Sequence, residues 1–364
     1  MNTNRRSKTL KAAVAVLIGI LATTMMTACG SGGSGGSGDG FSVALSNYYS
    51  GNNWRKQMVS SFTTAAKEAQ SKGIVSKFTT ADSNGSIPTQ ISQIQSMILE
   101  GYKSIVIDAA SPTALNGVIQ KACDAKVDVV VFDSLATAPC AHKAAFDYVQ
   151  YGEIQAQYTV DTLGPSGNYL MVRGIAGNTV DADIYQGVQN VMSKNPGWKR
   201  VGEVYGQWTE SIAEQQVQSV LPTLPKLDAI LTEGNDGGGA LKAVTKPGVK
   251  PPLVIQGNTG QGIQEWLAVK HQFPDYNTIS ISSYPSISTV AMWIAEQLNK
   301  GAEVPNQVGV PLLRITDKTA EPWVKTLGYD EIANNVLTQA DTERFIKASA
   351  AGKPVVVDDP LPIR

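Results

Sequence analysis

The chain has 364 residues, with 30 basic and 31 acidic side chains and a formal net charge of −1. Charged residues make up 17% and hydrophobic residues 42% of the sequence, which supports a well-buried core. The basic excess typical of nucleic-acid-binding proteins is missing, so no nucleic-acid partner is expected. The length favours two lobes over one ordinary domain.

Residues 1–28 have the pattern of an export signal. An apolar run over residues 12–22 is preceded by basic side chains, namely Arg5, Arg6, Lys8 and Lys11. Small residues then lead to Cys29, as in secretory signals. The run is too short for a transmembrane anchor, which needs about 20 residues. An ordinary secretory signal is the remaining alternative.

Residues 26–29, Met-Thr-Ala-Cys, resemble a bacterial lipobox, with Met26 in place of the usual leucine. Cleavage there leaves a lipid-modified cysteine, so Cys29 is the expected lipidation site. Residues 29–40 then form a Gly/Ser-rich tether with a reach of about 18 Å. We expect a lipid-anchored protein on the outer face of the cell membrane or in the periplasm.

Two further cysteines, Cys123 and Cys140, are left once Cys29 is set aside. In an oxidising compartment such a pair predicts a disulfide, worth about 3 kcal/mol for a loop of this size. Two free buried thiols are the alternative. The histidines, His142 and His271, lack ligand-like spacing, so we expect no metal site.

The first part of the tethered chain alternates strands and helices. Strands are expected at 41–46, 104–107 and 127–132, and apolar residues at helical spacing predict helices over 58–69 and 87–98. The nearly continuous apolar run at 127–132 is typical of a strand buried on both faces of a parallel sheet.

A second series of the same kind follows. The expected strands are 168–172, 200–205, 228–232 and 253–256, and the expected helices are 154–163, 182–192, 211–221 and 262–269. Two alternating series predict an α/β protein with two doubly wound, Rossmann-like lobes.

Open α/β sheets bind ligands beyond the carboxyl ends of their strands. The loops there are rich in Asn, Asp, Gln and Trp, which suits hydroxyl recognition by amides and carboxylates and packing by aromatic faces. No Ser/His/Asp arrangement, Walker loop or HExxH motif occurs. We therefore expect a binding protein without catalytic residues or a cofactor.

Asp133 is the leading candidate acceptor for ligand hydroxyls, and Asn235 and Asn258 come next. Each of these three residues also suits a plain turn after a strand. Trp54 and Trp208 are candidate stacking walls, with core packing as the alternative. Asn53 is a further hydroxyl contact, a role that Asn52 could hold instead.

At these loops the chain resembles the periplasmic sugar-binding proteins of the ribose/galactose type, which serve ABC importers. The resemblance covers roughly residues 41–305. The segments that carry the resemblance follow one another in the same order as in the family. They are residues 43–47 with 52–54, 130–133, 174–177, 207–208, 233–236 and 257–259.

The resemblance implies the type I periplasmic binding protein fold, with two lobes joined by a three-strand hinge. The crossovers are expected near 145–148, 282–284 and 304–308, which brings Ser283 to the cleft. The implied N-terminal lobe spans 41–145 plus 284–305, and the C-terminal lobe spans 146–283 plus 306–316.

The implied function is capture of a neutral sugar or polyol in the interlobe cleft and delivery to a membrane permease, by a monomer. Closure on the ligand is a population shift toward the state that binds it better. A sensor-type protein that presents a sugar-like signal to a membrane receptor is the alternative. The fold would be the same in both cases.

Departures from the family pattern bear on the ligand. Pentose binders place Arg after the strand-end Asp and another in the loop after residues 174–177, whereas Ser134 and Ala182 stand here. The cleft is therefore expected to lack rigid bidentate donors. Arg173 is a candidate to compensate. Asn258 replaces a usual carboxylate, which favours a ligand other than ribose.

Residues 317–364 extend beyond the usual end of the family. Helices are expected at 331–336 and 341–350, with Asp341 as the N-cap of the second. Residues 354–362 are expected to be extended. We expect the extension to pack on the C-terminal lobe.

Overall fold

The computed structural model describes residues 40–363. The predicted signal peptide, lipidated Cys29 and nearly all of the tether lie outside these residues. Contacts place the described residues in one unit, Gly38–Arg364. Within them, no helix has both the length and the apolar character needed to cross a membrane.

The N-terminal lobe is built on a six-stranded sheet in the order β11-β5-β4-β3-β1-β2, and all its neighbouring strands are parallel. The strands are β1 (Phe41–Asn47), β2 (Val75–Asp82), β3 (Ser104–Ile107), β4 (Asp128–Phe132), β5 (His142–Ala145) and β11 (Gln307–Gly309). The helices of this lobe are α1 (Asn53–Ser71), α2 (Ile87–Leu99), α3 (Asn116–Asp124) and α9 (Ile287–Asn299).

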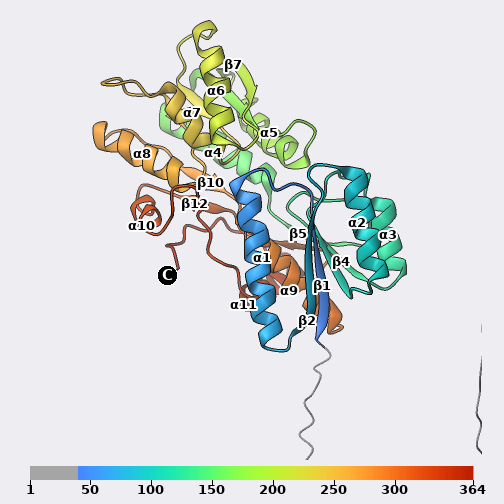
Figure 1. Cartoon of the computed structure of the whole chain (residues 1–364). Coiled ribbons are helices and arrows are strands. Elements are labelled where there is room, and N and C mark those ends of the chain that lie inside the picture. Colours follow the sequence, from blue (N-terminus) through green and yellow to red (C-terminus); the bar gives the residue numbers. More distant parts are fainter. Residues whose placement is uncertain (1–39, 364) are drawn as a thin grey trace, which may run out of the picture. The chain divides into compact units, whose positions relative to one another are not determined.

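Both faces of this sheet are covered, because alternate side chains of a strand point to opposite faces. Val106 and Val130 join a core that includes residues of α1 and α9. Their neighbours Ile105 and Val129 join a second core with residues of α2 and α3 (Figure 1). This arrangement confirms the predicted doubly wound architecture.

The C-terminal lobe has a four-stranded sheet in the order β7-β6-β8-β9, again parallel. Its strands are β6 (Ser166–Arg173), β7 (Gly197–Tyr205), β8 (Ala229–Leu231) and β9 (Leu253–Val254). Its helices are α4 (Tyr148–Leu163), α5 (Thr179–Met192), α6 (Glu210–Val220) with the short 3-10 turn η1 (Leu221–Thr223), α7 (Asp236–Val244) and α8 (Gly260–Gln272).

Helices α4 and α5 approach each other closely at two glycines. A Cβ on Gly152 would lie 2.0 Å from the carbonyl oxygen of Ile184, and one on Gly187 would lie 2.0 Å from that of Val149. Neither position accepts a side chain, so the two helices pack backbone to backbone. This contact fixes the relative position of α4 and α5, and side chains of both helices line the cavity described below.

The chain passes between the lobes after β5, after β10 (Ser280–Ser282) and after β11. The first two passages coincide with the crossovers expected near 145–148 and 282–284. The third differs from the expected position near 304–308. Strand β11 still pairs with β5, and the chain then reaches β12 (Leu313–Ile315), which pairs antiparallel with β10. Part of 306–316 thus belongs with the first sheet, where Val308 is fully buried.

The C-terminal extension contacts the N-terminal lobe in addition to the C-terminal lobe, on which the sequence analysis placed it. Helix α10 (Ala320–Val324) packs on α8, and α11 (Gln339–Ala350) packs on α9 and β11. The predicted helix at 331–336 is wrong. The backbone there bonds to side chains and loops of other elements instead, and Ile332 forms a bridge with Thr259.

The N-cap of helix α11 lies three residues before the predicted one. Thr338 is the N-cap, and Asp341 is the third helical residue and completes a capping box with it. The sequence correctly indicated a capped helix start near Asp341. In a capping box, the N-cap side chain accepts from the backbone N–H three positions later, and the side chain there accepts from the backbone N–H of the N-cap. The prediction assigned the cap to the wrong member of the pair.

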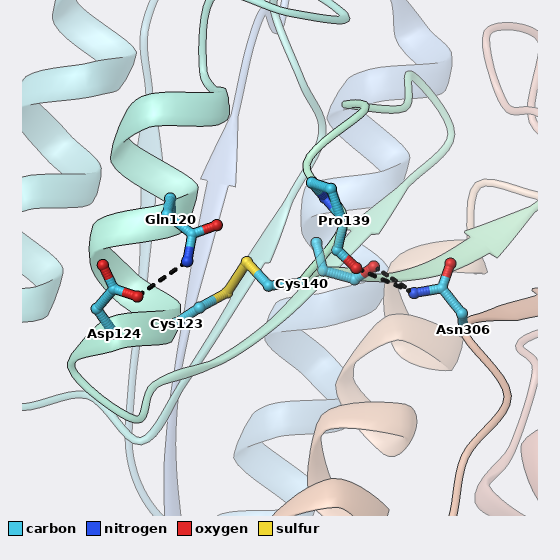
Figure 2. The surroundings of a disulfide bond; sticks show 7 residues. Gln120, Cys123, Asp124, Pro139, Cys140 and Asn306 are labelled. Atoms are coloured by element: carbon cyan, nitrogen blue, oxygen red, sulfur yellow. Dashed lines mark hydrogen bonds between the residues drawn. A yellow bond between two sulfur atoms is a disulfide. The ribbon is translucent and has the colours of Figure 1, made fainter.

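The predicted disulfide between Cys123 and Cys140 is confirmed (Figure 2). It joins the end of α3 to the loop that leads into β5, with the two Cα atoms 6.4 Å apart. Asn306 holds the same loop from the other side, because its Nδ2 donates to the carbonyl oxygen of Ala141 at 3.2 Å. The loop before β5 is therefore fixed at both of its sides.

Candidate ligand-binding site

A cavity lies at the carboxyl ends of strands from both lobes. This is where doubly wound sheets hold their ligands. It is lined by Asn52, Trp54, Arg55, Asp133, Tyr148, Tyr151, Val180, Ile184, Trp208, Glu233, Gly234, Asn235, Ser282 and Ser283. Trp54, Asp133, Trp208, Asn235 and Ser283 are the predicted site residues that the structure brings together here.

Asp133 is held in place by a buried cation and a phenol. Nη2 of Arg55 lies 3.6 Å from its Oδ2, and the hydroxyl of Tyr148 donates to its Oδ1 at 2.5 Å. Burial raises the pKa of Asp133, while the positive charge of Arg55 and the Tyr148 hydrogen bond act against that rise. The backbone of Asp133 has a φ of 55°, a left-handed conformation that Asp tolerates.

Arg55 corrects the expectation that the site lacks rigid donors. Its Nη1 forms an ion pair with the fully buried Asp108, and Nη2 is 3.4 Å from the hydroxyl of Ser134. Pentose binders place a guanidinium directly after the strand-end Asp. Here Arg55, in the first turn of α1, brings a guanidinium to that place. Ser134 itself does not line the cavity, and its hydroxyl also accepts from Nδ2 of Asn178 at 3.5 Å.

The position of Arg55 follows from helix capping. Asn52 is the N-cap of α1, and its side chain accepts a hydrogen bond from the backbone of Arg55. Asn53 is the first helical residue and does not line the cavity, whereas Asn52 does. Of the two candidate asparagines, Asn52 therefore fits the geometry of the cavity and Asn53 does not. An N-cap signal in the sequence would have shown that Arg55 lies one turn into the helix.

The two predicted stacking tryptophans both border the cavity. The indole N–H of Trp54 donates to the carbonyl oxygen of Ser283 at 3.0 Å, which joins α1 to the second crossover. Trp208 has a φ of 53°, which is rare for a bulky residue and is typical of functional sites. A Cβ on Gly174 would lie 2.2 Å from the indole of Trp208, so only glycine permits this ring position.

Arg173 is fully engaged by carboxylates and does not line the cavity. It binds Asp181 through two nitrogens, at 2.9 and 2.6 Å, and its Nε is 3.3 Å from Oε1 of Glu233. Its guanidinium carbon is 4.0 Å from the ring centroid of Tyr185. Arg173 therefore fixes the wall that carries Glu233, and it does not compensate for the missing arginines by facing a ligand.

Glu233 and Asn235 follow β8, as the sequence predicted for Asn235. Burial raises the pKa of Glu233 well above its ordinary value, Asp181 adds to the rise, and Arg173 opposes it. The carboxyl also accepts from the backbone N–H of Gly174 at 2.9 Å. Asn258 lies behind the cavity, where Nδ2 donates to the carbonyl oxygen of Ala333 at 2.9 Å.

Sequence reasoning missed the side chains that α4 and α5 contribute. Tyr148 and Tyr151 lie three residues apart, on one face of α4 directly after the first crossover. Val180 and Ile184 lie four residues apart on α5 and give the cavity an apolar wall. The sequence did offer one signal for these side chains, namely apolar and aromatic residues at helical spacing next to a predicted crossover. Among residues 40–363, no group of His, Cys, Asp and Glu could hold a metal ion.

A fold of two parallel sheets that share a cavity at their carboxyl ends defines a two-lobed binding protein for small ligands. A family described as "periplasmic binding protein domain" matches residues 43–303. The chain therefore belongs to the periplasmic binding protein family. Its members are substrate-binding components of transport and not enzymes, which confirms the expected absence of catalysis.

Individual relatives agree with this assignment. The chain is 25% identical over 313 residues to the xylitol-binding protein of Mycolicibacterium smegmatis, covering 84% of this chain and 83% of that protein. It is 26% identical over 249 residues to the D-xylose-binding periplasmic protein of Escherichia coli, covering 65% and 72%.

Solved structures extend the comparison. An ABC transporter solute-binding protein from Thermobispora bispora is 33% identical, with a TM-score of 0.81 and coverage of 88% of this chain and 99% of that one. A fructose-binding periplasmic domain of a hybrid two-component system has a TM-score of 0.66 at 17% identity, covering 78% and 97%. The second likeness shows the fold alone.

Proposed function

We propose that this chain is the solute-binding lipoprotein of an ABC importer, and that it captures a neutral sugar or polyol in the cavity between its lobes. Cys29 anchors the monomer to the membrane, and the closed, ligand-bound form delivers its cargo to the permease. The named relatives bind xylitol and D-xylose, which supports a five-carbon sugar or polyol.

The observation that carries the proposal is the cluster of Arg55, Asp133 and Tyr148 beside two tryptophans. Oriented carboxylates accept from ligand hydroxyls, and a guanidinium donates to ligand oxygens. Trp54 and Trp208 offer aromatic faces to the C–H surface of a sugar. The cluster thus matches both the polar and the apolar parts of such a ligand.

The charge of the cavity supports a neutral ligand. Arg55 already pairs with Asp108, and the cavity is also lined by the carboxyl groups of Asp133 and Glu233. An anionic ligand would find the cavity-lining cation Arg55 already paired, and any ionised carboxyl there would repel it. Sugar phosphates and sugar acids are therefore disfavoured.

The test is calorimetry on protein freed of endogenous ligand, with D-xylose, xylitol, D-ribose, L-arabinose, D-galactose and D-ribose 5-phosphate. We expect saturable binding of at least one neutral compound and none of the phosphate. At 100 times its Kd, the ligand should add about 2.7 kcal/mol of stability. A lack of binding across the whole series would overturn the proposal.

The sensor alternative has the same fold, as the fructose-binding sensor domain illustrates. It differs in its partner, because the ligand-bound form would engage a receptor instead of a permease. Sugar uptake by a strain that lacks this protein separates the two. Loss of uptake that is restored by the protein supports the importer role.

A further inference from the structure

Tyr151 has a buried hydroxyl without a hydrogen-bond partner. The residue is 2% exposed, it lines the cavity, and no acceptor or donor within residues 40–363 bonds to its Oη. Buried polar groups are normally hydrogen-bonded, and leaving one unpaired is costly. An orphaned hydroxyl in a ligand cavity indicates that its partner arrives with the ligand.

Two other buried tyrosines have hydrogen-bond partners for their hydroxyls. Tyr148 donates to Asp133. Tyr276 is 1% exposed and sits between the backbone N–H of Val254 at 3.2 Å and the carbonyl oxygen of Pro252 at 3.3 Å. Tyr148 lines the cavity and is paired, and Tyr276 lies away from the cavity and is paired, so among these three tyrosines only Tyr151 has a hydroxyl that is unpaired within residues 40–363.

The surroundings of Tyr151 suit a ligand hydroxyl. Gly234 has a φ of 116°, and a Cβ built on it would lie 3.8 Å from the Tyr151 hydroxyl oxygen, so the phenol faces the segment after β8. Glu233 belongs to that segment, and its buried Oε1 makes no hydrogen bond within the described residues, although it lies 3.3 Å from Nε of Arg173 in an ion pair. Burial and the nearby Glu233 and Asp236 raise the pKa of Tyr151 well above its ordinary value, which keeps the phenol protonated as a donor.

We propose that Tyr151 is a ligand-binding residue whose phenol donates a hydrogen bond to one hydroxyl of the bound sugar or polyol, while Glu233 accepts the hydrogen of that same hydroxyl. A hydroxyl is both donor and acceptor, so one ligand hydroxyl can accept from the phenol and donate to the carboxyl oxygen. The inference rests on the proposed function, since it assigns a contact within the same site.

The test uses Tyr151→Phe, with Tyr276→Phe as the matched control on a buried, hydrogen-bonded tyrosine. The midpoint of thermal unfolding is measured without ligand, and the affinity is measured by calorimetry with D-xylose and with the five other compounds named above. We expect Y151F to keep or raise the midpoint, because an unpaired hydroxyl is removed. Its affinity should fall about tenfold, equivalent to about 1.4 kcal/mol. Y276F should lower the midpoint and leave the affinity within about twofold.

A second measurement identifies the hydroxyl. Monodeoxy analogues of the compound that binds are compared between the wild-type protein and Y151F. One analogue should bind the wild type more weakly and lose little further affinity in Y151F, because the same hydrogen bond is already absent.

The outcomes separate the inference from the proposed function. If the wild-type protein binds a sugar and Y151F binds it equally well, the inference is wrong and the proposed function stands. A Y151F variant with a lowered midpoint and unchanged affinity would show a structural role only. If the wild-type protein binds no compound of the series, both fail.

Discussion

At the scale of single residues, the site depends on side chains held by partners that are distant in sequence. Asp133 is oriented by Arg55 and Tyr148, and Arg55 is in turn balanced by Asp108. Such a buried network rigidifies a site when each member is satisfied. Removing one member should therefore cost stability as well as ligand affinity.

Arg55→Ala should lower the free energy of unfolding by about 3–5 kcal/mol, because Asp108 would remain as an uncompensated buried charge. Denaturant unfolding measures the loss. Lys56→Ala is the control, since this neighbouring cation is exposed. Adding Asp108→Asn to the Arg55→Ala variant should recover part of the stability. Equal effects of the Arg55 and Lys56 variants would contradict the role of the ion pair.

Glu210 should give the protein a pH-dependent stability. Burial raises the pKa of Glu210 from 4.5 to about 7, with smaller contributions from Asp330 and Glu265, while the hydrogen bond from Thr259 opposes the rise. The folded protein thus holds the proton more tightly than the unfolded chain. The contribution of Glu210 to the free energy of unfolding therefore decreases as the pH rises from 4.5 to about 7, by at most about 1.4 kcal/mol per pH unit. Above that range the contribution is constant.

The measurement compares the wild-type protein with Glu210→Gln, which keeps the shape and an acceptor for Thr259. The difference in unfolding free energy between the two proteins should change across this pH range and stay constant at higher pH. Other buried carboxyls titrate in both proteins and cancel in the difference. A difference that is independent of pH would rule out a raised pKa at this position.

At the scale of elements, the C-terminal extension lies beyond the family match and links the two lobes. Gln57 of α1 exchanges two hydrogen bonds with the backbone of Ile332, at 2.8 and 3.0 Å. The next residue, Ala333, bonds to Asn258 of the other lobe through backbone and side chain. The segment around Ile332 therefore links α1 to the loop after β9.

A chain that ends at Lys353 should lose about 2–4 kcal/mol of stability, because partly buried hydrogen bonds disappear together. Trp323 donates to the carbonyl oxygen of Pro360 at 3.0 Å, and Asn335 donates to that of Leu361 at 3.0 Å. Thermal unfolding measures the loss, with Asp359→Asn as a control for the exposed ion pair to Arg314. The order of sugar affinities should be unchanged, and a changed order would contradict a structural role.

At the scale of the whole molecule, a ligand bound between Asp133 and Asn235 contacts both lobes. Such a ligand should shift the population toward a closed form. Small-angle X-ray scattering should show a smaller radius of gyration with saturating D-xylose, or with whichever sugar of the series binds. Asp133→Ala at the same sugar concentration should show no decrease. A radius that is unchanged by a bound ligand would argue against closure.

Much of the fold was predictable from local patterns. The apolar run that contains β4 and the helical spacing of α2 are properties of neighbouring residues, so the sequence shows them directly. Strand β11 was not recognised, because its three residues carry no periodic signal and gain their hydrogen bonds only from β5. The helix wrongly predicted at 331–336 also reflects tertiary contacts. Hydrogen bonds to Gln57 and Asn258 override the local preference for a helix there.

Strand ends located the site, and tertiary contacts decided its chemistry. Asp133, Asn235 and Trp208 follow strands and could be named from sequence, because parallel strands place such residues at one edge. Arg55 and Tyr151 were not named, because each lies just before the predicted start of a helix and acquires its role only where the two lobes meet. By itself, the sequence determined the α/β class, the disulfide pair and the strand-end loops that line the cavity. Only the tertiary structure decided which polar groups are paired and which await a ligand, because pairing depends on distances between residues far apart in the chain.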